Sequence, residues 1–462
     1  MKTRTIFVCQ ECGAQVPRWQ GRCNECGGWN TFVEEVLEKD ISSGISDISG
    51  FEPLQLVEIK ADPSSRIKTG ISEFDRVLGG GLTRGSMVLI GGAPGIGKST
   101  LLLQVADKLA FQKRKVLYIT GEESQQQVHI RAERMGLGST DLYIYPEINL
   151  ESIENQARIL DVDTLIIDSI QTLFKPGLSS APGSVTQVRE CASDLFRLCK
   201  TKGITTLIVG HVTKDGSIAG PRVLEHIVDT VLSFEGEGFQ SFRILKAIKN
   251  RFGNTREIGI FEMRENGLVG ISNPSEFFLS QRSTLAPGAV IMPVMEGSRP
   301  VLVEIQALVT RSTYGIPARR ASGLDLNRLQ VLLAVLERRG RLALGGADVY
   351  LNVAGGMSVE EPAADLGILL AVASAAVDRS VDSETVVIGE IGLGGEIRAV
   401  TAAEHRLREA ARLGFKKAII PAYNIHRSLT EPEGITLIGV ENIREALKKS
   451  LPGSHNKRGG ES

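Results

Sequence analysis

Residues 92–99 read Gly-Ala-Pro-Gly-Ile-Gly-Lys-Ser, a complete G-x-x-x-x-G-K-[ST] phosphate-binding loop. Its glycines let backbone N–H groups converge on the phosphates of a nucleotide. Lys98 supplies a positive charge to the β and γ phosphates, and the Ser99 hydroxyl is placed to ligate Mg²⁺. The residues predicted to bind the nucleotide are Gly92, Ala93, Pro94, Gly95, Ile96, Gly97, Lys98, Ser99 and Thr100. The loop therefore predicts that the chain binds a nucleoside triphosphate with Mg²⁺.

Two acidic positions downstream complete the chemistry of a hydrolase. The apolar run 165–167 ends at Asp168, the acid that such a loop needs to hold the Mg²⁺ shell. A second apolar run, 116–120, leads into Glu122 and Glu123, where a carboxylate can deprotonate the attacking water. An acidic pair is also favoured at the N-terminus of a helix by the helix dipole, so one of the two acids can have that role alone.

Four cysteines near the N-terminus form a C-x2-C-x10-C-x2-C array, namely Cys9, Cys12, Cys23 and Cys26. Two such pairs can surround one Zn²⁺ tetrahedrally with thiolates, and neighbouring glycines permit the turns. A segment of this length cannot bury a core of its own, so the metal is expected to fold it. Trp19 and Trp29 flank the second pair and serve either as packing or as a partner surface.

The composition bounds the class of protein. With 462 residues, 42% hydrophobic and 23% charged, the chain is expected to be globular with two or three domains. Its net charge of −1 means that nucleic-acid binding must depend on local patches. Since no apolar run is long enough to cross a bilayer and no signal peptide is evident, we expect a cytoplasmic protein without membrane contact.

Strands and helices alternate after residue 61, which predicts an α/β fold with a mainly parallel sheet. Strands are expected at 86–90, 116–120, 142–145, 164–168 and 204–210, with a helix at 99–109. Runs at 230–234, 242–247 and 257–262 favour antiparallel strands that finish the sheet. A separate α/β domain follows, with helices at 326–338, 364–377 and 402–413. The predicted organisation is a zinc ribbon (1–32), a linker (33–60), an ATPase core (61–272), a C-terminal domain (273–455) and a disordered tail (456–462).

These motifs, followed by Gly210-His211-Val212-Thr213-Lys214-Asp215-Gly216 and by Lys249-Asn250-Arg251-Phe252-Gly253, resemble the bacterial RadA (Sms) family of DNA-repair proteins over essentially the whole chain. The resemblance implies a core similar to that of RecA and the DnaB helicase, and a C-terminal domain similar to the Lon peptidase. It further implies a DNA-dependent ATPase and helicase that uses ATP, Mg²⁺ and Zn²⁺. Such a protein promotes branch migration of intermediates made by RecA recombinase, and its partners are single-stranded and branched DNA, RecA and further copies of itself in a hexameric ring.

The resemblance also implies roles for single residues. Glu122 is the expected general base with Glu123 as the alternative, and His211 is the expected sensor of the γ-phosphate. Lys249 and Arg251 match a pair that related motors project into a neighbouring subunit's site, with Arg251 as an arginine finger. A strand-end histidine and a solvated charge pair are the alternatives. The predicted catalytic residues are Lys98, Glu122, Glu123, Asp168, His211, Lys249 and Arg251.

Two stretches rich in glycine, serine and proline, 175–185 and 213–222, follow the carboxyl ends of strands. In RecA-like rings the equivalent loops line the central channel. The basic groups available in or near these stretches are the predicted phosphate contacts, namely Lys175, Arg189, Lys214 and Arg222. The C-terminal domain departs from Lon: Ala363 stands at the serine position, and Glu404 is expected where the lysine would be. Alanine offers no nucleophile, which makes an ATP-dependent protease the weaker alternative. A KaiC-like ATPase without motor action is the other.

Overall fold

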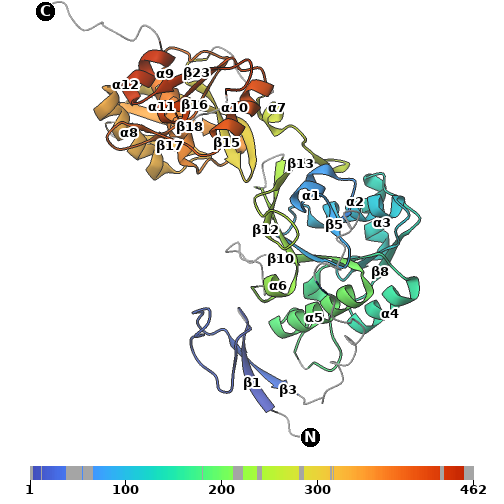
Figure 1. The fold of residues 1–462 in the computed structure, drawn as a ribbon. Helices are drawn as coiled ribbons and strands as arrows, with labels where there is room; N and C mark the ends of the chain where they lie inside the picture. Colours follow the sequence, from blue (N-terminus) through green and yellow to red (C-terminus); the bar gives the residue numbers. More distant parts are fainter. Residues whose placement is uncertain are drawn as a thin grey trace, which may run out of the picture. The chain divides into compact units, whose positions relative to one another are not determined.

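The protein is described by a computed structural model covering residues 4–11, 13–37, 55, 66–178, 180–211, 222–236, 242–279, 286–312, 315, 317–426 and 431–451. The chain divides into two compact units, Met1–Ser272 and Asn273–Ser462 (Figure 1). Most of the predicted linker and the whole predicted tail lie outside the described residues. Among the residues described, no helix combines the length and the apolar character that crossing a membrane requires.

The N-terminal segment is a small antiparallel sheet of β1 (Arg4–Cys9), β2 (Gln15–Val16) and β3 (Phe32–Leu37) in the order β2-β1-β3. All six residues of β3 pair with β1. The ribbon therefore extends past the expected boundary at residue 32, because 32–37 supply its third strand.

The core of the first unit is a sheet in which nine strands are described, in the order β14-β13-β12-β11-β6-β10-β9-β7-β8. Strands β8, β7, β9, β10, β6 and β11 run parallel, and β12 to β14 are antiparallel. The bounds are β6 (Met87–Gly92), β7 (Val116–Thr120), β8 (Leu142–Pro146), β9 (Thr164–Asp168), β10 (Thr205–His211), β11 (Thr230–Glu235), β12 (Phe242–Asn250), β13 (Ile258–Arg264) and β14 (Gly267–Gly270). A short pair, β4 (Arg66–Ile67) and β5 (Leu82–Thr83), stands beside it.

The predicted α/β class and mainly parallel sheet are confirmed, with one difference. The run 230–234 forms β11, which pairs in parallel with β6 and antiparallel with β12. The sheet therefore changes direction after β11, one strand later than the sequence pattern indicates.

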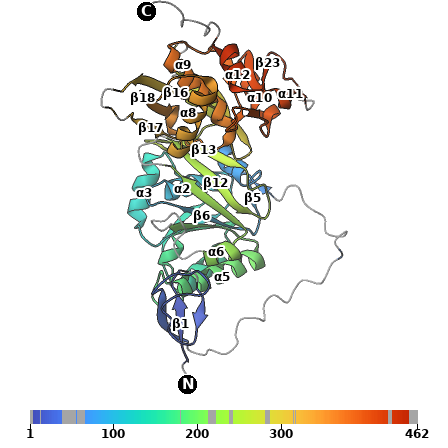
Figure 2. The ribbon, with the colours of Figure 1, turned by 90° about the vertical axis from the view of Figure 1, so that its left-hand side faces the viewer.

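Helices cover both faces of this sheet (Figures 1 and 2). Side chains alternate along β6: Val88 and Ile90 join a cluster with α1 and α2, whereas Met87 and Leu89 join a cluster with α4 and α5. This period of two is what a strand buried on both faces requires. The helices are α1 (Ser72–Val77), α2 (Lys98–Phe111), α3 (Gln125–Arg134), α4 (Leu150–Leu160), α5 (Val185–Lys202) and α6 (Arg222–Ile227), with a 3-10 turn η3 (Ile170–Thr172).

The second unit is a mixed sheet with the order β17-β18-β16-β15-β19-β22-β23 among its described strands. Its strands are β15 (Ala289–Glu296), β16 (Arg299–Arg311), β17 (Arg319–Ser322), β18 (Ala347–Val353), β19 (Thr385–Val387), β22 (Lys417–Pro421) and β23 (Thr436–Val440), with a small pair β20 (Glu390–Ile391) and β21 (Ile397–Arg398). Its helical elements are α7 (Pro274–Leu279), α8 (Leu326–Gly340), η4 (Ala354–Gly356), η5 (Pro362–Ala364), α9 (Asp365–Val377), α10 (Ala403–Arg412), α11 (Ala422–His426) and α12 (Ile443–Ser450).

Candidate functional site

The carboxyl ends of four neighbouring parallel strands meet at one edge of the first sheet. In the register, Gly92 of β6 lies opposite His211 of β10, and Asp168 of β9 lies opposite Thr120 of β7. This is the edge at which ligands bind in open α/β sheets. The topology therefore brings the phosphate loop and the predicted acids together, although they are far apart in the sequence.

The phosphate loop connects β6 to α2, which begins at Lys98. Gly92 and Gly97 have φ angles of 158° and 115°, and a side chain at Gly92 would come within 2.7 Å of the Phe234 carbonyl oxygen. The Lys98 ammonium is buried and donates to the carbonyl oxygens of Gly92 at 2.7 Å and Ala93 at 2.9 Å. Burial lowers its pKa, against the opposing pull of Asp168 and Glu122. A phosphate oxygen can take over these carbonyl contacts and relieve that burial cost.

Asp168 is held from the neighbouring strand by a residue that sequence reasoning missed. Tyr118 of β7 is fully buried, and its hydroxyl donates to Asp168 Oδ2 at 2.5 Å. Burial and the negative charge of Asp168 raise the pKa of Tyr118 well above its usual value, so its hydroxyl remains a donor. Tyr118 therefore holds one carboxylate oxygen of Asp168 from the neighbouring strand.

The two adjacent glutamates have different partners. Glu122 accepts a hydrogen bond from the Ser169 hydroxyl at 3.1 Å, next to Asp168. Glu123 is paired with Arg131 of α3, with N–O distances of 2.8 and 2.9 Å to its two oxygens. A side chain at Gly121 would collide with Thr172, so the backbone before the pair is tightly packed. The structure thus turns Glu122 toward the phosphate-loop edge and ties Glu123 to a helix.

Lys249 and Arg251 lie at the opposite edge of the sheet. Lys249 lies in β12 and Arg251 directly follows it. Strand β12 pairs with β11, so that Asn250 is opposite Thr230, which is itself opposite Val88 near the start of β6. Lys249 donates to the carbonyl oxygens of Glu225 at 2.5 Å and Val228 at 2.8 Å. Burial and the neighbouring guanidinium of Arg251 lower the pKa of Lys249.

Asp229 is the junction at this edge, and sequence reasoning did not identify it. Its buried carboxylate contacts Arg251 at 3.3 Å and Lys200 at 2.7 Å. It also accepts from the backbone N–H of Met87, the first residue of β6, at 3.0 Å. The Arg251 side chain is nevertheless half exposed.

Gly253 ends the Lys249–Gly253 motif where two backbones meet. A side chain at Gly253 would lie 3.2 Å from the Cα of Gly79, and one at Gly79 would lie 3.1 Å from the Cα of Gly253. Arg66 bridges the two segments by donating to the carbonyl oxygens of Leu78 and Phe252. The close approach favours glycine at both positions, and at Gly79 a φ angle of 80° adds to that preference.

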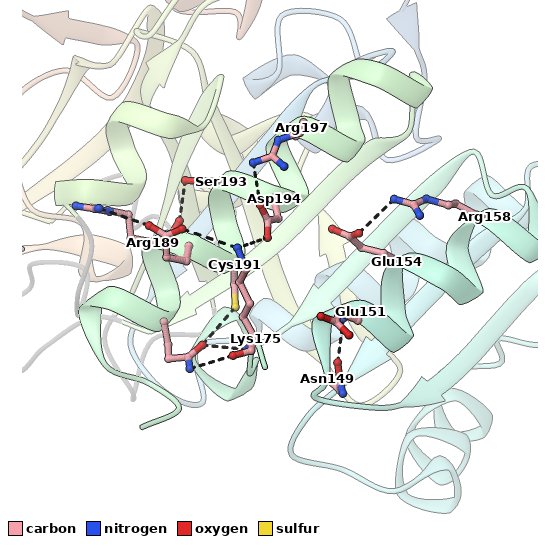
Figure 3. A network of polar contacts seen from close by, with 12 residues as sticks. Asn149, Glu151, Glu154, Arg158, Lys175, Arg189, Cys191, Ser193, Asp194 and Arg197 are labelled. Carbon is pink, nitrogen blue, oxygen red and sulfur yellow. Dashed lines mark hydrogen bonds and ion pairs between the residues drawn. The ribbon is translucent and has the colours of Figure 1, made fainter. Parts of the chain in front are cut away.

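The predicted DNA contacts are only partly described. Lys214 and the side chains of His211 and Arg222 lie outside the described residues. Figure 3 shows Lys175 in a network with acids of α5, where its ammonium lies 2.7 Å from Asp194, and the guanidinium of Arg189 is 3.5 Å from Glu190. The buried Gln187 side chain hydrogen-bonds the backbone of Lys175 and of Ser180, which fixes the start of this loop to α5.

The thiols of Cys9, Cys23 and Cys26 form the candidate metal centre, and Cys12 lies outside the described residues. The three sulfur atoms are within 4.8 Å of one another, and those of Cys9 and Cys26 are 3.7 Å apart. A tetrahedral Zn²⁺ with thiolate bonds of about 2.3 Å places its sulfurs roughly 3.8 Å apart, so the spacing fits zinc.

The two cysteine turns have the same backbone design. The carbonyl oxygen of Cys9 accepts from Gly13 N–H at 2.8 Å, and that of Cys23 accepts from Gly27 N–H at 2.9 Å. Gly13 and Gly27 have φ angles of 75° and 79°. Each turn therefore needs a glycine four residues after its first cysteine.

The C-terminal unit has ion pairs where its Lon-like site would be. Ala363 lies in η5 between two acids. Glu361 receives two hydrogen bonds from Arg406, at 2.7 and 2.6 Å, and Asp365 receives two from Arg328, both at 2.6 Å. Burial raises the pKa of Asp365 despite its arginine partner.

The expected position of Glu404 in this unit is wrong. Glu404 lies on the outer side of α10, where it pairs with Arg408 one turn later. Arg406 is the residue of this helix that points inward: it is 1% exposed and also donates to the carbonyl oxygen of Pro293 at 2.6 Å. Glu404 and Arg406 are both charged and lie two residues apart, so the sequence alone did not show which of them points inward.

Family models match three parts of the chain. They describe a rubredoxin metal binding domain at residues 7–34, an AAA domain at residues 53–217 and subunit ChlI of Mg-chelatase at residues 335–424. The first two matches, with the cysteine cluster, confirm the predicted cofactors ATP, Mg²⁺ and Zn²⁺.

Curated relatives match almost the whole chain. The DNA repair protein RadA of Bacillus subtilis is 50% identical over 98% of this chain and all of the relative. The DNA repair protein RadA of Listeria monocytogenes is 49% identical over 98% of this chain and 99% of the relative. Among solved structures, a KaiC-like protein of Pyrococcus horikoshii covers 45% of this chain and 98% of its own at 22% identity, with a TM-score of 0.37.

Proposed function

This chain belongs to the RadA family of DNA repair proteins and has an ATPase core, and on that premise we propose that it is a helicase. In this proposal ATP hydrolysis drives translocation on single-stranded DNA, and the motion promotes branch migration of intermediates that RecA recombinase makes. The working form is a ring, with six subunits as the expected number, and it acts in the cytoplasm.

The proposed roles at the phosphate-loop edge are supported by the strand register and by the contacts of Lys98, Glu122 and Glu123. Lys98 neutralises the β and γ phosphates, while Ser99 and Asp168 hold Mg²⁺. Glu122 is the general base, because the carboxylate of Glu123 is occupied by Arg131. His211, at the end of β10 beside Gly92, senses the γ-phosphate.

The observation that carries the ring is the position of Arg251. Asp229 holds it beside Met87, at the amino end of β6, whereas the phosphate loop follows the carboxyl end of that strand at Gly92. Five residue steps of a strand separate these ends by roughly 16 Å. Arg251 therefore stabilises the γ-phosphate in a neighbouring subunit and not in its own, as an arginine finger supplied in trans.

In the proposed motor, Lys175, Arg189, Lys214 and Arg222 contact the phosphates of the DNA strand. The ion pair of Lys175 with Asp194 supports a contact that forms by exchange, since a phosphate can replace the carboxylate. Each subunit of the proposed ring consists of the zinc ribbon, the ATPase core and the C-terminal domain, with the boundaries predicted from the sequence.

The test mixes two inactive variants. Lys98→Ala and Arg251→Ala should each abolish hydrolysis stimulated by single-stranded DNA. In a randomly mixed ring, about a quarter of the interfaces combine an intact loop with an intact finger, so hydrolysis should return to about that fraction. Recovery of no activity, with co-assembly shown by light scattering, would refute action in trans. Absence of stimulation by DNA in the unmodified protein would refute the motor.

A further inference from the structure

The zinc ribbon exposes both tryptophans of the chain. Trp19 is 54% exposed and Trp29 is 70% exposed. Indole rings are usually mostly buried, because they carry a large apolar surface. The described core of the ribbon consists instead of Cys9, Cys23 and Phe32, with Phe7, Ala14, Val16 and Cys26 packed against them. These two rings therefore do not stabilise the ribbon by packing inside it.

The two indoles converge on one small residue. A side-chain carbon placed on Gly21 would lie 3.7 Å from the ring of Trp19 and 3.9 Å from the ring of Trp29. The backbone fixes this arrangement, since Trp29 is the antiparallel bridge partner of Arg22 and the Asn30 N–H donates to the Gly21 carbonyl at 2.8 Å. Glycine thus leaves the space between the rings open.

A guanidinium completes the surface. The Arg22 guanidinium lies 5.8 Å from the centroid of the Trp29 ring, and its Nε donates to the Gly27 carbonyl at 3.2 Å. Arg18 is exposed beside Trp19. Residues 17–30 contain these two arginines and one acid, Glu25.

The surroundings distinguish between two kinds of partner. A protein-docking site has an apolar centre around its aromatic anchors. Here Gly21 lies between the rings, and the other residues near the two tryptophans in the sequence are polar or small, namely Gln20, Asn24, Gly28 and Asn30. Open aromatic rings with guanidinium groups and polar neighbours are typical of surfaces that stack the bases of single strands.

We propose that Trp19, Trp29 and Arg22 form a stacking platform for the bases of single-stranded DNA. The rings take one or two unpaired bases, and Arg18 and Arg22 contact the adjoining phosphates. This inference rests on the DNA binding proposed above, and it assigns the ribbon a direct contact with the strand.

The sequence provides a selective probe, because Trp19 and Trp29 are the only tryptophans. Titration of the full chain with an oligothymidylate should quench its tryptophan emission, and duplex DNA should not. Trp29→Ala should weaken binding of labelled oligothymidylate about tenfold by fluorescence anisotropy. Trp29→Phe should retain most of the affinity. Phe111→Ala, which removes an exposed aromatic ring from α2, is the matched control and should leave the affinity unchanged.

Unchanged emission while anisotropy reports bound oligothymidylate would overturn the platform. So would an unchanged affinity of the Trp19→Ala, Trp29→Ala double variant with its zinc retained. Zinc content, measured by release with a chelator and a colorimetric dye, shows whether each variant keeps a folded ribbon. The result is separable from that of the proposed motor: quenching without DNA-stimulated hydrolysis would refute the motor alone, and stimulation without quenching would refute the platform alone.

Discussion

The charged side chains around Lys98 in the first α/β unit and around Ala363 in the second have different partners. In the first unit, the buried Lys98 ammonium donates to two carbonyl oxygens of its own loop, and the exposed Glu122 accepts a hydrogen bond from the Ser169 hydroxyl. In the second, Glu361 and Asp365 each receive two short hydrogen bonds from an arginine. Carbonyl and hydroxyl contacts can be exchanged for a ligand, whereas a bidentate pair of opposite charges is already complete. The first arrangement suits a reaction site and the second suits a structural joint.

The largest expected effect is on ATP hydrolysis by the first unit, where the contacts can be exchanged for a ligand. Glu122→Gln should lower the rate of ATP hydrolysis by about 10²–10⁴-fold while ATP still binds, because the amide cannot accept a proton from water. Glu123→Gln is the matched control and should retain most of the hydrolysis, since its partner is Arg131. Steady-state hydrolysis and nucleotide binding measure both. A larger loss for Glu123→Gln would reverse the assignment.

A smaller effect is expected on the stability of the second unit, where arginine and carboxylate groups are already paired. Glu361→Ala leaves the fully buried Arg406 without its carboxylate and should lower the free energy of unfolding by about 3 kcal/mol. Glu404→Ala removes a carboxylate from a surface pair on α10 and should cost less than about 1 kcal/mol. Urea denaturation gives both values. Equal effects of the two variants would contradict the distinction between a joint and a surface pair.

The smallest effect sharpens the comparison within the first unit. Tyr118→Phe removes the donor to Asp168 and should raise the Mg²⁺ concentration for half-maximal hydrolysis by about 3–10-fold, as expected for one hydrogen bond to a charged group. The apparent affinity for ATP at saturating Mg²⁺ should change less. If the Mg²⁺ dependence is unaltered, Tyr118 only fills space.

Much of the fold was readable in the sequence because local rules and tertiary packing agree. The unbroken apolar runs 87–90 and 165–167 indicate strands covered on both faces, and the structure has β6 and β9 there. The phosphate loop and the cysteine pairs have fixed spacings that local geometry alone requires. Their positions follow from the chain without knowledge of distant neighbours.

What escaped prediction depends on distant partners. Glu122 and Glu123 are adjacent and chemically identical, and only the position of Arg131 on α3 separates them. In the sequence, Tyr118 resembles an ordinary residue of an apolar strand. Its hydroxyl contacts Asp168 diagonally across the register of β7 and β9, which only the pairing of these strands shows. A polar tip on the buried face of a strand was the available signal.

Asp229 has a consequence for communication between sites. One carboxylate joins Arg251 to the N–H of Met87, and Met87 begins the strand that ends in the chain's own phosphate loop. In the proposed ring, movement of Arg251 from Asp229 to a neighbour's nucleotide would remove one ion-pair partner from the carboxylate that anchors β6. Because coupling between two binding sites is reciprocal, the nucleotide that Arg251 contacts in the neighbour and the nucleotide in this chain's own phosphate loop would change each other's affinity by the same factor. The order in which the subunits hydrolyse ATP would then depend allosterically on the contacts of Asp229.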